Sequence, residues 1–156
     1  FMLRLLRNWL LLDSTICKFG ISGPLKCFCC TEANVETLDH IFCGGEEAVL
    51  VWKFFGSLAG VFYLCASIRD YMASWWFSSC TNVFLQFVHL VILSLICWNI
   101  CKARNKTRFE GKVYAPNAIC GFSFDGVRNL FNLKFSGYSR ALMTWPAFYA
   151  FLVSFR

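Results

Sequence analysis

The sequence predicts a mainly α-helical, small domain with a short, knuckle-like Cys/His turn near its start and a long apolar central helix. Hydrophobic residues make up 58% of the 156 positions and charged residues 15%, against roughly 25% charged in a typical soluble domain. A chain this apolar can bury enough surface to offset its ordering entropy, which excludes disorder. Apolar residues recur at helical spacing, without a glycine period or sustained heptads, so collagen and coiled-coil classes are excluded as well.

Two helices are expected at the N-terminus. From Phe1 to Leu12 apolar residues, Trp9 among them, recur three or four positions apart, which leaves the intervening arginines facing water. A shorter helix from Ser14 to Phe19 follows, with Asp13 as its N-cap and Gly20 as its stop.

Three further helices are expected before the most apolar stretch. Thr37 is a suitable N-cap for a short helix that ends at Cys43. The next helix, Glu46 to Leu58, begins with acidic residues, which the helix dipole favours in a first turn. A short helix is expected over 66–76.

The stretch from Val83 to Ala103 predicts the central helix. Residues 83–101 carry no charge for nineteen positions, close to the ~20 residues that span a bilayer, and basic residues follow, as the positive-inside rule would require. Polar side chains such as Gln86 and Asn99 interrupt the run. A buried central helix is therefore preferred, and a small membrane protein held through 83–101 is the alternative.

The C-terminal part is predicted less fully. Pro116 suits the first position of a helix. One face of that helix is expected to be apolar through Ile119, Phe122, Val127, Leu130 and Phe131. The last twenty residues receive no assignment, and the chain is divided into a domain at 1–112 and a helical extension at 113–156.

One spacing in the chain is typical of a metal site: Cys27-Phe-Cys29-Cys30, nine residues, then His40. Two thiolates three positions apart on a tight turn can bind one Zn²⁺, and a later His supplies a third tetrahedral ligand. Cys43 lies three residues after His40, so a helix would place both side chains on one face. Cys43 is therefore the expected fourth ligand. Cys29 is less suitable because it lies between two ligands. The alternative is an ordinary turn with reduced, metal-free thiols.

Cysteine usage points to a reducing compartment. Four of the ten cysteines lie within 27–43, and the others are scattered among apolar residues, where reduced cysteines usually pack as small hydrophobic side chains. A Cys pair with a nearby His indicates metal binding inside the cell, in nucleus or cytoplasm, rather than secretion. No signal peptide is recognised, and the chain begins at Phe1 without an initiator.

Two separated stretches together resemble a known family. They are CFCCTEANVETLDHIFCGGEEAVLVW, from Cys27 to Trp52, and WNICKARNKTRFEG, which starts at Trp98. With the leucine-rich opening helix and Gly20-Ile21, they are similar to the zinc-binding domain of plant LINE-type (non-LTR) retrotransposon reverse transcriptases. The matching positions are Leu3 to Leu12, Cys27, Cys30, Glu36-Thr37, His40, Phe42, Ala48, Val51-Trp52, Trp98, Ile100, Lys102 and Arg104-Asn105. The resemblance covers about residues 1–112.

The chain departs from that family at two positions. The family's usual fourth ligand follows the His by five, and this chain has Gly45 there. Zinc binding then depends on Cys43, or has been lost. The tryptophan usual before the lysine is Cys101 here.

The resemblance implies a non-catalytic accessory module that helps a polymerase to hold RNA or DNA. Residues 101–112 carry five basic residues against Glu110. The basic residues Lys102, Arg104, Lys106, Arg108 and Lys112 are expected to bind phosphates and Asn105 a base or sugar edge. The expected partners are the RNA or DNA backbone and a polymerase domain of the parent polyprotein, with no small-molecule substrate. The alternative for this stretch is a solvated helix end, where cations suit the helix dipole.

No enzymatic motif is recognised, so a non-enzyme is expected. The sequence has no Tyr-x-Asp-Asp motif, no glycine-rich phosphate loop and no Gly-x-Ser-x-Gly motif, and its nine acids form no cluster for a two-metal nuclease. We expect a fragment or decayed copy of a retroelement protein. A zinc-independent protein-interaction module is a third hypothesis.

Several aromatic residues are expected to be structural. Trp75, Trp76 and Phe77 can stack on unpaired bases, but core positions or cover by a neighbouring domain are preferred. His89 lies in an apolar run and is expected to be a core histidine with its hydrogen bonds satisfied.

Overall fold

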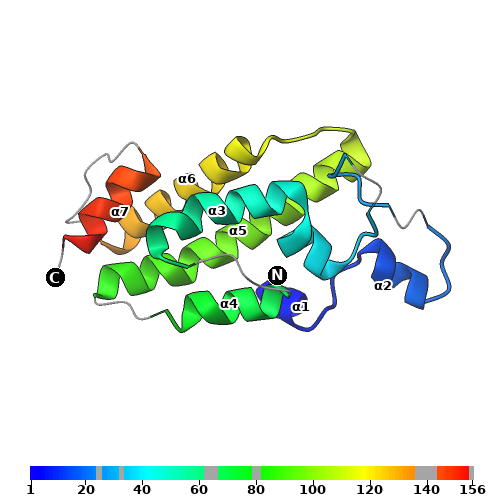
Figure 1. The fold of residues 1–156 in the computed structure, drawn as a ribbon, viewed down its shortest axis with the longest axis horizontal. Helices are drawn as coiled ribbons and strands as arrows, with labels where there is room; N and C mark the ends of the chain where they lie inside the picture. Colours follow the sequence, from blue (N-terminus) through cyan, green and yellow to red (C-terminus); the bar gives the residue numbers. More distant parts are fainter. Residues whose placement is uncertain (24–25, 32–33, 62–66, 79–81, 136–143, 155–156) are drawn as a thin grey trace.

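The computed structural model describes residues 1–23, 26–31, 34–61, 67–78, 82–135 and 144–154. Over these ranges the chain is helical without any strand, and the one β-type pairing is an isolated antiparallel bridge between Lys26 and Val35. The predicted mainly α class is therefore confirmed (Figure 1).

The elements follow one another in a simple order. They are α1 (Met2–Leu6), α2 (Asp13–Lys18), the π-helical turn η1 (His40–Gly44), α3 (Glu46–Ala59), α4 (Ile68–Trp76), α5 (Val83–Glu110), α6 (Pro116–Lys134) and α7 (Trp145–Val153).

Helix α5 runs along the length of the molecule, and the other elements surround it (Figure 1). It contacts α3, α4, α6, α7 and η1. The side chain of Asn82 caps it by accepting a hydrogen bond from the Leu85 N–H at 2.8 Å, and Gly111 ends it in the left-handed conformation with φ 66°. The long apolar central helix is thus confirmed, and at 28 residues it extends past the predicted Ala103.

Among the described helices, α5 is the one whose length and composition would allow it to cross a membrane. Half of its most apolar 18-residue window (50%) is buried inside the molecule. A core helix of a soluble protein meets the same criteria, so this observation leaves the membrane alternative as a prediction.

The N-terminal helices differ from expectation. Helix α1 ends at Leu6 rather than Leu12, because Asn8 adopts a left-handed conformation (φ 56°) that a helix cannot continue through. Trp9 is consequently 58% exposed instead of lying on a buried helix face. Asp13 is the first residue of α2 rather than its cap, and Gly20, with φ 77°, follows the helix as predicted.

The middle helices agree with expectation. Helix α3 has Glu46 and Glu47 in its first turn, and Gly60 ends it with φ 67°. Helix α4 lies within the predicted 66–76, and its described N-cap is Ser67, which accepts a hydrogen bond from Asp70 N–H. The side chain of Leu58 lies outside the described part of the chain.

Helix α6 begins with Pro116 at its first turn, as predicted. Its predicted apolar face is only partly buried, because Phe122 is 52% and Leu130 is 42% exposed. The buried stripe instead runs through Ile119, Cys120, Ser123, Phe124, Val127 and Phe131. Of the unassigned C-terminus, residues 145–153 form α7.

The C-terminal helices share one hydrophobic core with the rest of the chain. In α7, Trp145 packs edge-on against Phe55 of α3, with ring centroids 5.0 Å apart, and Phe148 packs against Phe131 of α6. Buried residues from α1 to α7 belong to this core. Residues 1–112 and 113–156 thus pack on each other, and their division into a domain and an extension stays a prediction.

Candidate metal centre

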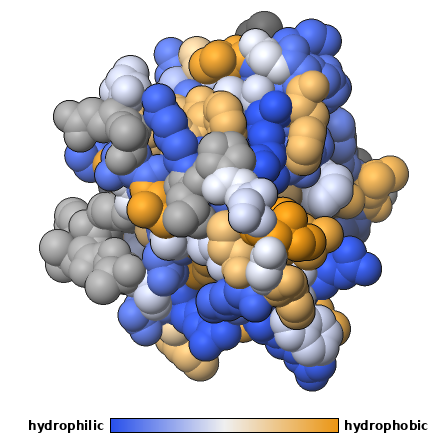
Figure 2. All heavy atoms as spheres, turned by 90° about the vertical axis from the view of Figure 1, so that its right-hand side faces the viewer, coloured by the Kyte–Doolittle hydropathy of each residue, from blue (hydrophilic) through white to orange (hydrophobic). Residues whose placement is uncertain are grey.

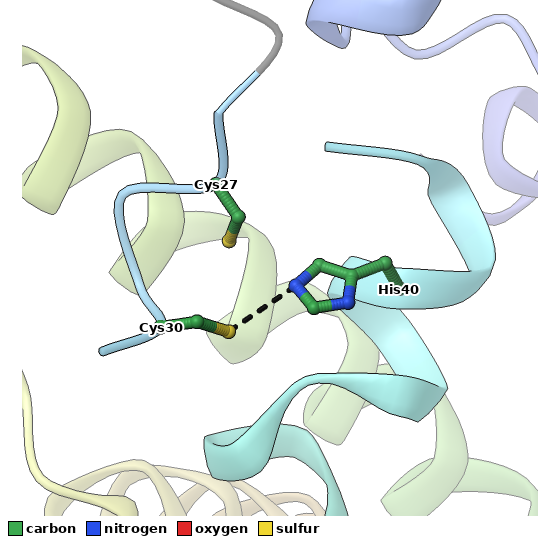
Figure 3. A group of neighbouring side chains, drawn as sticks. All are labelled: Cys27, Cys30 and His40. Carbon is green, nitrogen blue, oxygen red and sulfur yellow. Dashed lines mark hydrogen bonds between the residues drawn. The ribbon is translucent and has the colours of Figure 1, made fainter. Parts of the chain in front are cut away.

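Three of the four predicted metal ligands converge at one end of α3. The donor atoms of Cys27, Cys30 and His40 all lie within 4.8 Å of one another (Figure 3). Cys30 Sγ and His40 Nε2 are 3.2 Å apart, within hydrogen-bond distance. In a tetrahedral site with Zn–S bonds of about 2.3 Å, two donors lie about 3.8 Å apart. The three residues therefore fit a zinc ion after small side-chain adjustments.

Backbone pairing brings the two cysteines to this place. The Cys27 N–H donates to the carbonyl of Asn34 at 2.7 Å, beside the Lys26–Val35 bridge. The segment carrying the cysteines is thereby held against the segment that leads to His40. Cys27 is buried and Cys30 is half-buried, so both thiols face the interior of the fold.

His40 is held by its own helical turn. The Thr37 hydroxyl accepts a hydrogen bond from His40 N–H at 3.1 Å, although the N-cap of η1 is Asp39 rather than the predicted Thr37. The indole N–H of Trp52 in α3 donates to the Phe42 carbonyl at 2.6 Å. The turn is π-helical, a conformation that is often found at functional sites.

Electrostatics around the cysteines favour a cation. A hydrogen bond with the Cys29 side chain lowers the pKa of Cys27 to about 5, whereas burial raises the pKa of Cys30 to about 11. Burial, together with the negative charge of Cys27, raises the pKa of Glu47 to about 7. A divalent ion would stabilise the thiolates of both cysteines and the Glu47 carboxylate at once.

The expectation that Cys43 is the fourth ligand is wrong. Its thiol is not in the group formed by the other three donors, and its side chain is buried in the core at 2% exposure. There it lies near Cys97, whose pKa rises through burial and through the charge of Cys43. The reason is the π-helical turn: it holds more residues than an α-helical turn, so a side chain three positions after His40 no longer shares its face.

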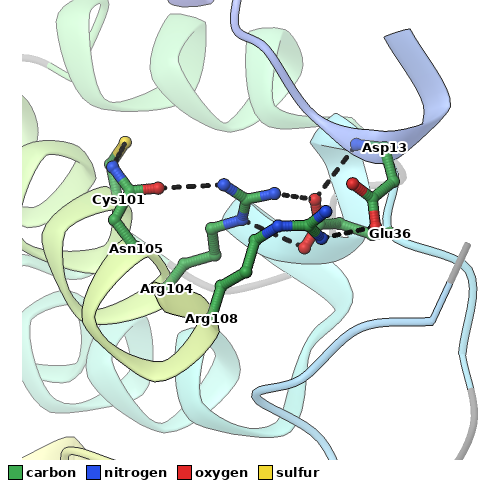
Figure 4. A network of polar contacts seen from close by, with 6 residues as sticks. All are labelled: Asp13, Glu36, Cys101, Arg104, Asn105 and Arg108. Carbon is green, nitrogen blue, oxygen red and sulfur yellow. Dashed lines mark hydrogen bonds and ion pairs between the residues drawn. The ribbon is translucent and has the colours of Figure 1, made fainter. Parts of the chain in front are cut away.

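Two residues predicted to bind nucleic acid are used inside the fold (Figure 4). Arg104 is 5% exposed and pairs with the fully buried Glu36, its Nε donating to Oε2 at 3.0 Å and its Nη2 to Oε1. Arg108 Nη1 donates to Asp13 Oδ2 at 2.5 Å. The expected phosphate-binding role is therefore wrong for Arg104, because the buried Glu36 takes its guanidinium, while for Arg108, whose side chain is 17% exposed, it stays a prediction.

The network joins three distant parts of the chain. The Asp13 N–H at the start of α2 donates to Glu36 Oε1 at 3.1 Å. Glu36 lies between Cys30 and His40, so its pairing with Arg104 attaches the loop between the metal ligands to α5. The sequence predicts Asp13 as a helix cap and Glu36 as a position of the family resemblance, but it does not predict their pairing with the two arginines. The signal was the i, i+4 spacing of Arg104 and Arg108, which places them on one helix face.

The other predicted nucleic-acid residues remain at the surface of α5. Lys102 is exposed and lies over the ring of Trp98, with 5.8 Å from Nζ to the ring centroid. Asn105 is exposed and accepts a hydrogen bond from Arg104 Nη1 at 2.9 Å. Lys106, whose side chain is 44% exposed, pairs with Glu110 at 2.6 Å.

A cavity opens beside these lysines. It measures about 190 Å³ and is lined by Asn99, Lys102, Lys106, Tyr114 and Phe122, among others. Cationic and aromatic side chains therefore border the same hollow.

Of the other aromatic residues expected to be structural, some are buried and some are exposed. Trp75 is buried against Trp52, with ring centroids 6.4 Å apart, whereas Phe77 is 85% exposed. His89 is 6% exposed and hydrogen-bonds to the Ser78 hydroxyl at 3.0 Å and to the Tyr149 hydroxyl at 3.2 Å. The expected core histidine is confirmed.

The end of the molecule that carries α2, the Cys/His turn and the last turns of α5 has a mixed surface. Figure 2 shows hydrophilic regions there, divided by hydrophobic patches. Exposed large apolar side chains of these segments include Phe19 (75%), Phe28 (44%) and Phe109 (73%). Of the scattered cysteines, Cys97 and Cys120 are buried thiols, and Cys65 and Cys80 lie outside the described residues.

The family model for zinc-binding in reverse transcriptase matches residues 1–52 of this chain. The matched stretch holds all three converging ligands. It supports a zinc-binding module of the kind associated with reverse transcriptases, and the match is to this module rather than to a catalytic domain. No curated protein and no solved structure matches the chain.

Proposed function

We propose that the chain is a zinc-binding, non-catalytic accessory module of a LINE-type retrotransposon reverse transcriptase, and that its α5 surface helps to hold RNA or DNA. The observation that carries the proposal is the convergence of Cys27, Cys30 and His40 inside the stretch that matches the family. The second stretch of the resemblance also takes part, because its Arg104 binds Glu36 from the first.

Zinc content is the direct test of the metal function. Elemental analysis of the purified chain should give about one zinc per molecule. Cys27→Ser and His40→Ala should each abolish stoichiometric zinc, while Cys43→Ser, a buried thiol outside the donor group, should retain it. Zinc that persists in both ligand variants would refute the site, and a wild type without stoichiometric zinc would favour a zinc-independent interaction module.

The nucleic-acid surface is proposed to consist of Trp98, Lys102, Asn105 and Lys106. The first, second and last of these recur four positions apart on α5, so they form one stripe, and the cavity with Tyr114 and Phe122 adjoins it. Lysines at this spacing can follow a phosphate backbone, and Trp98, which is 44% exposed, can stack on an unpaired base.

A salt titration of RNA and single-stranded DNA binding tests this surface. Removing both lysines in Lys102→Ala/Lys106→Ala should reduce the log–log salt slope by ~1.4–1.8, at ~0.7–0.9 for each phosphate contact. Lys53→Ala, an exposed lysine on α3, is the matched control and should leave the slope unchanged. Equal slopes for all three proteins would exclude the stripe as a phosphate-binding surface.

A membrane protein is the second candidate, because α5 has the length and apolar composition of a membrane span. Carbonate washing of membranes from cells that express the chain separates the two functions. Under the first proposal, with a reducing nuclear or cytoplasmic location, the chain is recovered in the soluble fraction. Retention in the washed membranes would support the second.

A further inference from the structure

A small cavity faces the three metal ligands. It has a volume of about 20 Å³, and Cys27, Cys30, His40, Gly45 and Glu47 are among the residues that line it. This volume corresponds to about one water molecule, and the polar atoms that border it belong to the cysteines, His40, Glu47 and Arg104. The Cys/His site thus has room for a single small ligand on the side that faces Gly45.

The side chain missing at Gly45 accounts for that room. A Cβ at this position would lie 3.7 Å from Cys30 Sγ and 3.8 Å from His40 Nε2. The backbone there is extended, with φ −69° and ψ 145°, a conformation that any residue adopts. Backbone geometry therefore does not require glycine, and a side chain at this position would point at the metal ligands.

No other described side chain completes the set. The group of donors within 4.8 Å of one another contains only Cys27, Cys30 and His40 among the residues that the structure describes. Cys29 and Glu47 also line the cavity, but their donor atoms lie outside that group.

We propose that the metal is held by three protein ligands and that a water molecule, which a small anion can replace, takes the fourth position in the cavity beside Gly45. The inference rests on the metal-binding function proposed above. Three protein ligands with one exchangeable position is the arrangement through which protein-bound zinc takes up external ligands, whereas structural zinc sites are closed by four.

Cobalt(II) in place of zinc makes the fourth position visible, because its absorption spectrum reports both the thiolate ligands and the coordination geometry. The proteins to compare are the wild type, Gly45→Cys, Gly45→Ala and Cys29→Ser. Azide should shift the visible bands of wild type and Cys29→Ser in a saturable manner, because it replaces the water. The methyl group of Gly45→Ala, by contrast, takes up part of the cavity and should weaken the azide response without changing the thiolate absorbance.

Gly45→Cys should close the site. A third thiolate beside the first two should raise the thiolate-to-cobalt absorbance about 1.5-fold, in proportion to the number of thiolates, abolish the azide response and tighten cobalt binding. Gly45→Ala carries the same Cβ without the sulfur, so it controls for the close approach of 3.0 Å between that Cβ and the His40 carbonyl.

The outcomes separate this inference from the function on which it rests. Cobalt uptake by the wild type without an azide response overturns the exchangeable position but leaves metal binding intact. Loss of thiolate absorbance in Cys29→Ser would identify Cys29 as the fourth ligand and also overturn it. Failure of the wild type to bind cobalt or zinc at all overturns both proposals.

Discussion

Glu36 shows how a single buried charge organises this fold. Glu36 lies in the sequence between Cys30 and His40, and its side chain is fully buried. Its carboxylate accepts hydrogen bonds from the Asp13 backbone N–H and the Arg104 guanidinium. An ion pair in such a place is sensitive to the loss of one partner, since the remaining charge is left buried.

Glu36→Gln is therefore expected to destabilise the protein by about 3 kcal/mol, the cost of leaving a buried guanidinium without its counterion. Urea unfolding followed by circular dichroism measures this change. Glu110→Gln, which removes a carboxylate paired with Lys106 at the surface, is the matched control and should leave the unfolding midpoint in place. Equal midpoints for the two variants would contradict the structural role of Glu36.

His89 makes stability depend on pH. Burial lowers its pKa from 6.5 to about 4, so as the pH falls the unfolded chain takes up this proton before the folded one does. The stability that the neutral imidazole provides is present above about pH 6.5 and lost towards pH 4. Between pH 7 and 4.5 the loss should be about 2 kcal/mol.

Urea midpoints at these two pH values, measured in EDTA so that metal binding does not contribute, test the histidine. His89→Gln can keep both hydrogen-bond partners without titrating, and it should lose less stability than the wild type between pH 7 and 4.5. An identical pH dependence of the two proteins would assign the effect to other groups.

At the scale of elements, two helical glycines differ in what surrounds them. A Cβ at Gly56 in α3 would lie 2.6 Å from the Val61 carbonyl oxygen and 3.1 Å from the Tyr71 hydroxyl, so backbone would have to move. A Cβ at Gly121 in α6 would meet nothing within 4 Å.

Gly56→Ala should therefore destabilise the protein by roughly 1–3 kcal/mol through overpacking. Gly121→Ala should stabilise it by about 0.5–1 kcal/mol, because alanine is the better helix former. Thermal unfolding of the two variants side by side gives the sign of each change. A stabilising Gly56→Ala would show that the end of α3 is packed less tightly than the structure has it.

Most helices of this chain could be predicted because local signals define them. Ser67, Asn82 and Pro116 stand at helix starts, and Gly60 and Gly111 stand at helix ends in left-handed conformations. Helix α1 could not be delimited, since its apolar spacing continues past Asn8.

The candidate metal site could be predicted only for residues whose short separation in the sequence brings their side chains close together. The Cys-x2-Cys pair and His40 converge as expected, but Cys43 does not join them, because a π-helical turn cannot be distinguished from an α-helical one in the sequence. The pairing of Arg104 with Glu36 connects residues 68 positions apart. Local patterns carry no information about such a contact.

At the scale of the whole molecule, metal binding should contribute to global stability. The ligands come from two segments of the chain, so an ion bound only to the folded state holds these segments together and stabilises the fold by mass action. Free zinc at about 100 times its dissociation constant should add about 2.7 kcal/mol.

EDTA should accordingly lower the melting temperature of the wild type, and added zinc should restore it. Calorimetric scans of the wild type and Cys27→Ser, each with zinc and with EDTA, test this. The variant should melt at one temperature in both buffers. A wild type that is indifferent to EDTA would mean that the fold does not depend on the ion.

The bond between Glu36 and Arg104 has a thermodynamic consequence. Glu36 belongs to the loop that connects the metal ligands Cys30 and His40. Its partner Arg104 lies in the sequence of α5 between Lys102 and Lys106. A bound RNA or single-stranded DNA that shifted this part of α5 would change the affinity of the site for the metal ion. By thermodynamic reciprocity, metal binding would change the affinity of the protein for the nucleic acid by the same factor. The metal ion and the nucleic acid would then each regulate the binding of the other.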